Sequence, residues 1–566
     1  MLDIPLPAPR LNGTNTKPLE PSLADVYAKI EHDPLLPKAT KDALLCSLRR
    51  IAKVLGRDLS QLPARLGALR YGIGRLHHAQ LGISRKTLQN HVANLKAAIR
   101  HVAGQERLSG RGIVLSPAWK SLFDQLTDRR LRLGLIGFLK YCSATGIDPF
   151  SVSETSVAAF IAYATEVQFT VNPNDLHKQV TRCWNRAKET VPGWPQITLP
   201  VPDFRRQPAS MPWEVFELSF LEDVEHYLSL LGGENLLDED APDKPCKPST
   251  IKTRRDYLRL AASAAVKQGV PAESLRSLAD LVSPPVVRRI LELYVAKKGG
   301  KISTFTIDMA ERLYAIARTY AKAPEEQLRQ LERFCIKLRP NRRPGLTEKN
   351  MAVVRAFKDP QNRARLKALP TQLFNEALAE RDARMQGAVT AELAVLIQIL
   401  LVAPMRLANL AALHLETSVI RIGGPEPTYH LVIPPEDVKN DQPLEYPLPK
   451  AVSEMLGRYL TEFRPRLCRQ DNPWLFPGEA VGHKTKGTLS DQIIKRITKG
   501  LGIRVTPHQF RHLAAAFILE KDPANYEFVG RVLGHKNLET TIRHGASLQP
   551  SQNDRRRARL SGDAAW

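Results

Sequence analysis

The chain is long, basic and of ordinary hydrophobicity. It has 566 residues, more than one hydrophobic core normally organises, so three or four domains are expected. Its hydrophobic share of 43% excludes a disordered protein. Lysine and arginine number 82 against 58 aspartate and glutamate, a net charge of +24. This excess indicates a polyanionic partner, with nucleic acid ahead of an anionic membrane surface, although a merely basic surface is the plain alternative.

Targeting segments and cysteine pairs are not evident in the sequence. We find no run of about 18 apolar residues, which predicts that nothing spans a membrane. The N-terminus, MLDIPLPAPRLNG, has no positive region followed by an apolar core, so no signal peptide is expected. The six cysteines are scattered without a CxxC pair. They predict reduced thiols in a cytoplasm rather than disulfides or a zinc site.

Helical periodicity dominates the first part of the chain. Two segments repeat apolar residues at i, i+4, i+7 and i+11, which predicts amphipathic helices. Their stripes are Leu44, Leu48, Ile51 and Leu55, and Leu131, Leu135, Phe138 and Cys142. Ser84 and Ser303 stand where N-caps of two later helices are expected. We therefore expect three faintly similar helical units, at roughly 37–104, 117–190 and 216–320.

Proline-rich and charged segments separate these units. Pro192–Trp213 holds too many prolines for a regular helix. Gly232–Pro248 reads as an acidic loop inserted within the third unit. The basic run Arg339–Gly345 is expected to be a hinge before the last domain, either as a solvated connector or as a segment that follows a phosphate backbone.

The pattern changes after Gly345. Helices are expected to about Leu413, followed by a hairpin of SVIRI and TYHLVIP that turns around Gly423–Pro427. PLEYPLP is expected to be an edge strand, because its prolines exclude a central one. From about Ala451 the chain is again helical. The predicted fold class is mainly α and multidomain, with one small antiparallel sheet in an α-rich last domain.

Four short segments of this last domain combine cationic and imidazole side chains. APMRLANLAALHLE carries Arg406, and EDVKNDQPLEYPLP carries Lys439 in a turn. TPHQFRHLAAA carries His508 and Arg511, and VLGHKNLETTIRH carries His535. Guanidinium groups bind two oxygens of one phosphate together. Imidazoles donate hydrogen bonds and exchange protons near neutral pH.

Each of these residues also has a plain structural interpretation. Arg406 can cap or salt-bridge its helix, Lys439 can be a solvated lysine, and His535 can be a packed turn residue. His508 and His512 are spaced like a zinc-binding pair, but no glutamate lies between them and no third ligand is evident. No metal site is therefore predicted. The functional interpretation depends on the joint pattern.

Taken in order, the four segments resemble the tyrosine recombinase (phage integrase) family over roughly Leu346–Gln549. In that family an Arg, a Lys, a His-x-x-Arg pair and a second His surround the scissile phosphate. The resemblance implies that Arg406 and Arg511 stabilise a phosphorane-like transition state and that Lys439 protonates the departing 5′-oxygen. It also implies duplex DNA as partner, and no metal or nucleotide cofactor, because a covalent phosphotyrosine conserves bond energy. The family often has an acid where this chain has Asn409.

The nucleophile of that family is missing. Just after the TT pair, where the family has its tyrosine, this chain has His544 and Gly545, and no tyrosine follows Tyr526. One explanation is a natural or engineered loss that leaves a binding-competent but cleavage-deficient protein. Others are a tyrosine donated in trans by a partner subunit, attack by His544, and weak hydrolysis by water.

Basic residues upstream are candidate DNA contacts. By resemblance the third unit is a core-binding domain, whose phosphate contacts position a protein without reading sequence. The candidates there are Lys252, Arg254, Arg255, Arg259 and Lys301, and in the first unit Arg85 and Lys86. For any one of them a solvated charged helix face is an equal alternative. The two earlier units can serve additional DNA binding or protein assembly.

The predicted domains follow from these patterns. They are an N-terminal helical unit (1–110), a second unit with its linker (115–205), a core-binding-type domain (212–338), a recombinase-type catalytic domain (345–553) and a basic tail (554–566). The leading hypothesis is a cytoplasmic site-specific recombinase of a mobile element. We expect it to self-associate on DNA and to work with partner recombinases, and we expect no binding to membranes. The alternatives are a non-enzymatic DNA-binding accessory factor and a type IB topoisomerase-like enzyme, against which the LGH…TT pattern argues.

Overall fold

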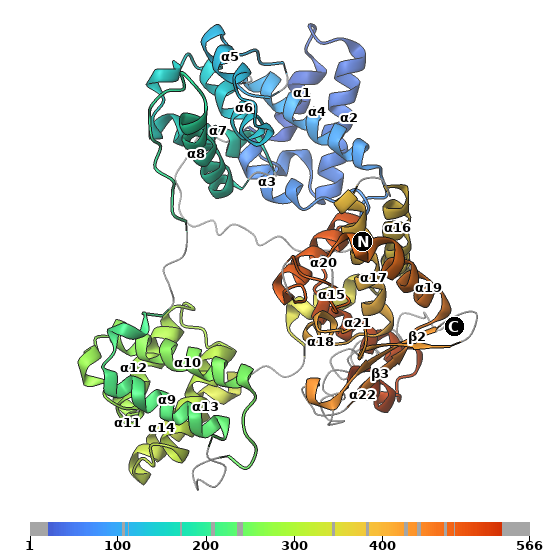
Figure 1. Ribbon diagram of the computed structural model, residues 1–566. Helices are drawn as coiled ribbons and strands as arrows, with labels where there is room; N and C mark the ends of the chain where they lie inside the picture. The colour runs from blue at the N-terminus through green and yellow to red at the C-terminus, as the bar shows by residue number, and fades with distance from the viewer. Residues whose placement is uncertain are drawn as a thin grey trace, which may run out of the picture. The chain divides into compact units, whose positions relative to one another are not determined.

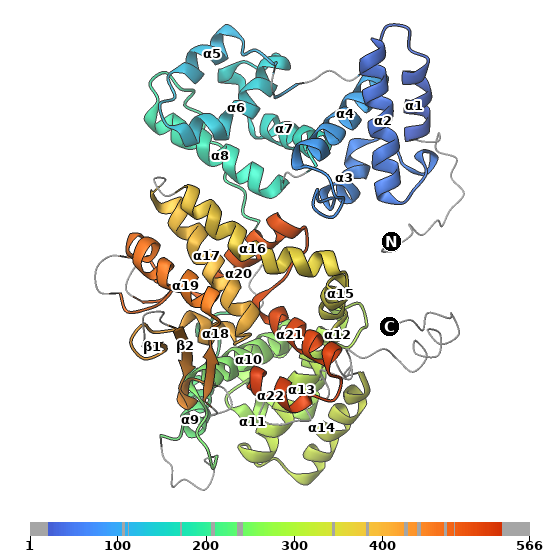
Figure 2. The same ribbon diagram turned by 90° about the vertical axis from the view of Figure 1, so that its right-hand side faces the viewer.

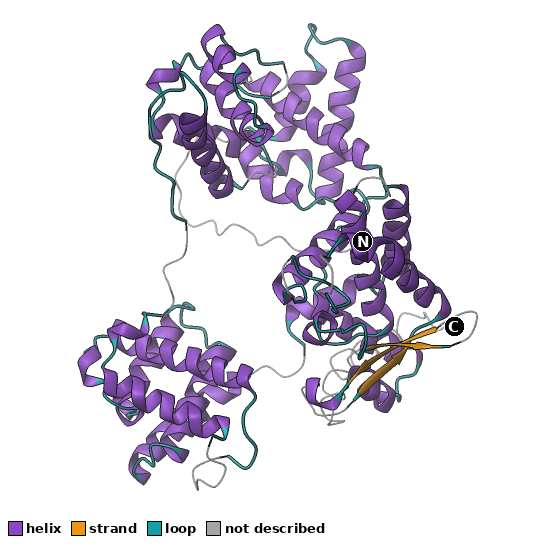
Figure 3. Ribbon diagram, in the orientation of Figure 1, coloured by secondary structure: helices purple, strands orange, loops and turns teal. Residues whose placement is uncertain are grey.

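The computed structural model describes residues 21–534 apart from short gaps. The gaps are 105–107, 111, 170–171, 205–209, 235–241, 342–345, 381–383, 424–427, 439–442, 469–471 and 480–481. The chain separates into two compact units, one combining Met1–Phe204 with Asn350–Leu548 and one within Arg205–Lys349. Helices dominate both units, and one sheet occurs in the described part of the last domain (Figures 1 and 3). The mainly α fold class is confirmed, whereas the exact domain boundaries stay predictions.

Four helices form the first helical segment. The predicted stripe is correct, since Leu44, Leu48 and Ile51 are buried in one core and Leu55 packs at its margin. Ser84 is the N-cap of the last of these helices, accepting a hydrogen bond of 3.0 Å from the Thr87 N–H. The helices are α1 (Leu23–Glu31), α2 (Lys38–Leu55), α3 (Leu66–Gly74) and α4 (Arg85–Ala103).

A second set of four helices has its own core. All four residues of the predicted stripe from Leu131 to Cys142 are buried there. Trp184 packs edge-on against Trp194, with ring centroids 5.2 Å apart. The described part of the proline-rich segment that follows, 192–204, contains no helix, as its prolines predict. The helices are α5 (Pro117–Asp124), α6 (Arg129–Ala144), α7 (Glu154–Val167) and α8 (Pro173–Thr190).

The second compact unit is a helical bundle. Its helix α10 buries four alanines, which let α9 and α12 approach closely. Ser303 caps α13 as predicted, accepting from the Thr306 N–H at 3.2 Å. The helices are α9 (Leu218–Gly232), α10 (Pro248–Lys267), α11 (Leu278–Leu281), α12 (Pro284–Ala296), α13 (Thr304–Thr319) and α14 (Glu325–Leu338).

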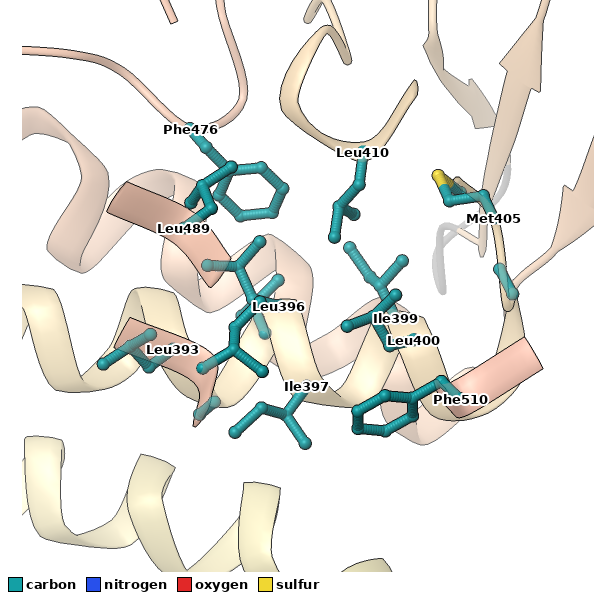
Figure 4. Close-up of a cluster of buried hydrophobic side chains, with 14 of the residues drawn as sticks. Leu393, Leu396, Ile397, Ile399, Leu400, Met405, Leu410, Phe476, Leu489 and Phe510 are labelled. Carbon is teal, nitrogen blue, oxygen red and sulfur yellow. The ribbon is translucent and has the colours of Figure 1, made fainter. Parts of the chain in front are cut away.

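The last domain is built around one apolar helix, α17. Its side chains Leu396, Ile397 and Leu400 are buried with Leu489 of α20 and Phe510 of α21 (Figure 4). The helices are α15 (Glu348–Ala356), α16 (Pro360–Ala379), α17 (Arg384–Val402), α18 (Leu407–Ala411), α19 (Lys450–Arg458), α20 (Lys486–Leu501), α21 (Pro507–Lys521) and α22 (Tyr526–Leu533).

The same helix bears on the expectation that no membrane-spanning run is present. Met385–Val402 has a mean hydropathy of 1.8 and is long and apolar enough to cross a membrane by composition alone, although no such run was predicted. Its polar residues are few and spread out, so only the average over the helix reveals it. Because 67% of this window is buried inside the domain, α17 is explained as a core helix.

A three-stranded antiparallel sheet lies beside these helices (Figure 2). The predicted hairpin is correct, with strands β1 (Val419–Ile422) and β2 (Thr428–Ile433). The predicted edge strand is also correct: β3 (Leu444–Pro447) pairs only with β2 in the described sheet, and Leu431 lies opposite Tyr446. Along β3 Leu444 and Tyr446 point into the core while Glu445 is exposed.

Candidate functional site

Helix α21 presents the two residues of the His-x-x-Arg pair. Thr506 and Gln509 form a capping box at its start, in which the Thr506 N–H donates to Gln509 Oε1 at 2.8 Å. Pro507 occupies the first turn, where its missing N–H costs nothing. Phe510 is buried in the core beside α17 (Figure 4). The start of the helix is thus fixed from both the backbone and the core.

Arg511 is buried and joins two distant segments. Only 5% of the residue is exposed. Its Nη1 donates to the Pro404 carbonyl at 2.8 Å, and its Nη2 donates to the Leu533 carbonyl at 2.6 Å. Burial, together with the nearby charge of Arg406, lowers the pKa of Arg511 to about 10. The group therefore stays charged at neutral pH.

Arg406 stands immediately before helix α18, as predicted, at the N-cap position. Burial lowers the pKa of its guanidinium. Its Nη1 is buried and has no hydrogen-bond partner among the described residues. A buried N–H without a partner is costly, by about 1–3 kcal/mol and more in a charged group. Arg406 and Arg511 together therefore form a cationic pair that an anion would stabilise.

Tyr446 of β3 completes this cluster and was missed by the sequence analysis. Its hydroxyl donates to the Val532 carbonyl at 2.9 Å. Burial raises its pKa to about 12, although the charges of Arg511 and Arg406 oppose this shift. The signal in the sequence was the alternation of β3, which places Tyr446 on the buried face. A buried phenol that holds its proton is a structural support rather than a nucleophile.

His508 lies at the surface of α21, next to a buried histidine. Its ring packs edge-on against that of His512, with centroids 4.8 Å apart. Gln509 Nε2 donates to Asn350 Oδ1 at 3.1 Å, which leaves the Asn350 amide to donate to His512 Nε2 at 3.1 Å. His512 therefore accepts at Nε2 and is held in one orientation. The ring of His512 therefore supports that of His508 from one side. The sequence had suggested His512 only as a possible zinc ligand, an interpretation that was set aside.

Asn409 of α18 connects this helix to the segment that precedes Lys439 in the sequence. It is buried, and its Nδ2 donates to the Asp437 carbonyl at 3.3 Å. Asp437 precedes Lys439 by two positions in the sequence. Lys439 itself lies outside the described residues, as do His535, His544, Gly545 and the basic tail 554–566.

The upstream candidates lie in both compact units. Lys252 and Lys301 are exposed. Arg255 forms an ion pair with Glu225, and Arg259 lies 3.6 Å from Asp256. The Nε atoms of Arg254 and Arg259 are buried without a partner among the described residues. Arg85 and Lys86 are exposed at the start of α4. The described residues hold no group of three or more metal-ligating side chains.

Comparison with known proteins finds similarity in the last part of the chain. Residues 372–549 match the model of the phage integrase family. Curated relatives named tyrosine recombinase XerD match as well. That of Brucella suis biovar 1 (strain 1330) is 33% identical over 102 residues, 17% of this chain and 31% of the relative. That of Listeria monocytogenes serotype 4b (strain F2365) is 34% identical over 110 residues, 18% of this chain and 35% of the relative.

Solved structures give weaker likenesses. XerH bound to its difH substrate is 16% identical with a TM-score of 0.32, covering 63% of this chain and 100% of that one. A lambda integrase fragment bound to a core site is 12% identical with a TM-score of 0.35, covering 59% of this chain and 97% of that one. These TM-scores are too low to match individual residues of this chain with residues of those structures.

The family match concerns the last domain. Within residues 372–549 the chain is similar to the phage integrase family, and over a shorter stretch it is similar to the tyrosine recombinases named XerD. The chain spans about a third of the length of the curated relatives it matches.

Proposed function

We propose that the protein binds duplex DNA as a site-specific recombinase or integrase-family protein and takes part in recombination or integration of a mobile element. The observation that carries this proposal is the pair formed by buried Arg511 and half-buried Arg406, of which Arg406 keeps a buried, unpartnered N–H within the described structure. A phosphodiester is the anion that fits a two-guanidinium site in a strongly basic chain. The family match supports the same substrate class.

The residues divide the chemistry among them. Arg406 and Arg511 bind the non-bridging oxygens and neutralise the charge that develops on them in the transition state. His508 donates a hydrogen bond from the open side of α21, and His535 supplies a second. Lys439 protonates the departing 5′-oxygen as general acid. Asn409 supports the turn that leads to Lys439 through the Asp437 carbonyl.

Strand cleavage is the step that this chain lacks. The sequence has His544 and Gly545 where the nucleophile is expected. Tyr526 lies at the start of α22 and precedes His535 in the sequence, so it does not occupy the expected position. We propose that the chain is cleavage-deficient on its own. A tyrosine donated in trans by a partner recombinase, attack by His544 and slow hydrolysis are the competing routes to any cleavage that is observed.

A non-enzymatic role is the second candidate. The absence of a tyrosine at 544–545 favours a DNA-binding accessory or regulatory factor that keeps the recombinase fold. In either role Lys252, Arg254 and Lys301 of the second unit contact phosphates, the protein self-associates on DNA, and it works in the cytoplasm. Covalent attachment to DNA separates the enzyme from the factor.

Phosphate-ethylation interference tests the two-arginine site. The full chain is first used to select a binding duplex from a randomised pool. Ethylation of one particular phosphate should weaken DNA binding by the wild-type protein. Ethylation of the same phosphate should not weaken binding by the Arg406→Ala variant. Arg504→Ala, which removes an exposed arginine of the same domain, is the control and should keep the wild-type pattern. Identical patterns for wild type and Arg406→Ala would refute the proposed phosphate site.

A further inference from the structure

The outward face of helix α4 has an unusual composition. Arg85, Lys86, Gln89, Asn90 and Ala93 are all exposed. At 3.6 residues per turn they fall within about half of the helix circumference. The opposite side, with Leu95, Ala98 and Ile99, is buried in the core of the first segment. The exposed side thus carries polar and basic side chains and one small residue, Ala93. The buried side anchors the helix in the core.

The stretch of sequence that leads into and through α4 carries charge of one sign. Residues 59–104 contain seven lysines and arginines and no aspartate or glutamate. Helix α14 shows the ordinary pattern of a solvated surface, since Glu325 and Arg329 lie 3.7 Å apart on its exposed side. The stretch 59–104 has no acid of its own, and Asp33, which lies beside His101 at the far end of α4, is contributed by the loop after α1. The exposed face of α4 is therefore complementary to a polyanion.

The charged side chains in the second half of α4 are already engaged with other residues. Near its middle, Lys96 lies 4.5 Å from the centroid of the Phe169 ring. At its end, His101 Nε2 lies 2.6 Å from Asp33 Oδ2. Arg85, Lys86, Gln89 and Asn90 have no hydrogen-bond or ion-pair partner among the described residues. The open residues are those at the N-terminal end, where recognition helices contact base edges.

We propose that α4 enters the major groove of duplex DNA and reads its sequence with Gln89 and Asn90. The side-chain amides of these two residues each offer one donor and one acceptor, which match the N6 and N7 groups of adenine. Arg85 and Lys86 supply contacts to guanine and phosphate, and Ala93 lets the helix approach the bases closely. This rests on the proposed DNA-binding function and assigns sequence reading to the N-terminal segment.

Selection from a pool of randomised duplexes tests the inference with the full chain. A random segment of about 40 bp, roughly four turns of B-DNA, gives room for a complete site. Gln89→Ala combined with Asn90→Ala should erase base preference at two or three adjacent positions, lowering discrimination there about tenfold. The dependence of affinity on salt should remain that of the wild type.

A second double variant separates base reading from charge. Arg85→Ala with Lys86→Ala should weaken binding to every sequence and reduce the slope of log K against log salt by about 2. The matched control is Arg129→Ala with Arg130→Ala, an exposed basic pair at the start of α6 that should have a smaller effect. Thermal unfolding should show that all variants fold.

The outcomes distinguish this inference from the function it depends on. If the Gln89/Asn90 variant selects the same sequences as the wild type, α4 does not read bases. If the α6 pair lowers affinity as much as the α4 pair, general positive charge explains the binding and the inference is wrong. A wild-type chain that binds no duplex at all would overturn the proposed function as well.

Discussion

The guanidinium of Arg511 and the carbonyl oxygen of Leu533 are joined by a hydrogen bond of 2.6 Å from Nη2. Leu533 is the last residue of α22, whose final carbonyls have no partner within the helix. Gly534 follows with a left-handed φ of 59°. One arginine therefore holds the end of the helix that leads directly to His535 in the sequence.

Arg511→Ala should destabilise the last domain. It leaves the carbonyls of Pro404 and Leu533 without the partners that they now have, at a cost of about 1–3 kcal/mol each. The unfolding midpoint, followed by calorimetry, should fall clearly. Arg504→Ala removes an exposed arginine nearby and should change stability by less than about 0.5 kcal/mol. Equal effects of the two substitutions would contradict this role of Arg511.

Arg406→Ala should behave differently. Because Arg406 Nη1 is buried without a partner in the described structure, its removal should cost little stability or even increase it. Binding of an anion should suffer instead. Sulfate at constant ionic strength should raise the unfolding temperature of the wild type by more than that of Arg406→Ala. Sulfate stabilises most proteins in general, so the difference between the two proteins is the quantity to measure.

Tyr446→Phe should lose about 1 kcal/mol through the missing hydrogen bond to Val532. The folded-state pKa of about 12 lies above the unfolded value near 10. The stability that Tyr446 contributes is therefore fully present below pH 10 and is lost as the pH rises through about 12. Urea unfolding of wild type and variant should differ constantly up to about pH 10 and then converge. A difference that stays constant above pH 12 would contradict this role of the Tyr446 hydroxyl.

The cysteines should differ in reactivity. Burial raises the pKa of Cys142 to about 12 and that of Cys335 to about 11, whereas Cys46 is exposed. Iodoacetamide at pH 8 should label Cys46 in the folded protein and spare the other two until the chain is unfolded. Mass spectrometry of the digested protein gives the order of labelling. Rapid labelling of Cys142 in the folded chain would show that its core is open.

Periodic features of the fold were predictable, because they depend only on local sequence. The stripes of α2 and α6, the caps Ser84 and Ser303 and the proline-limited edge strand all follow from such signals. A helix was expected where α17 lies, but its long hydrophobic character was not recognised, because polar residues such as Glu392 interrupt the apolar run. Glu392 is buried and pairs with Lys484, and no local pattern links these two positions.

The candidate site was predictable in its residue types but not in its contacts. The motif spacing indicated Arg406, His508 and Arg511, and the structure brings Arg406 and Arg511 close enough for their charges to interact. The partners of Arg511 are backbone carbonyls, which every residue possesses and which therefore leave no trace in the sequence. Tyr446 and Asn350 reach the site only through tertiary packing, whereas His512 lies one helical turn after His508 on α21.

The most direct test of the account is a suicide-substrate assay on the selected duplex, with covalent protein–DNA adducts scored on a denaturing gel. The wild-type chain should be compared with His544→Tyr and Gly545→Tyr, because these are the positions where the family has its tyrosine. We expect no adduct from the wild type and an adduct from one tyrosine variant, because the proposed function assigns every catalytic role except that of the nucleophile to residues of this chain. An adduct formed by the wild-type chain alone would contradict the cleavage-deficient account.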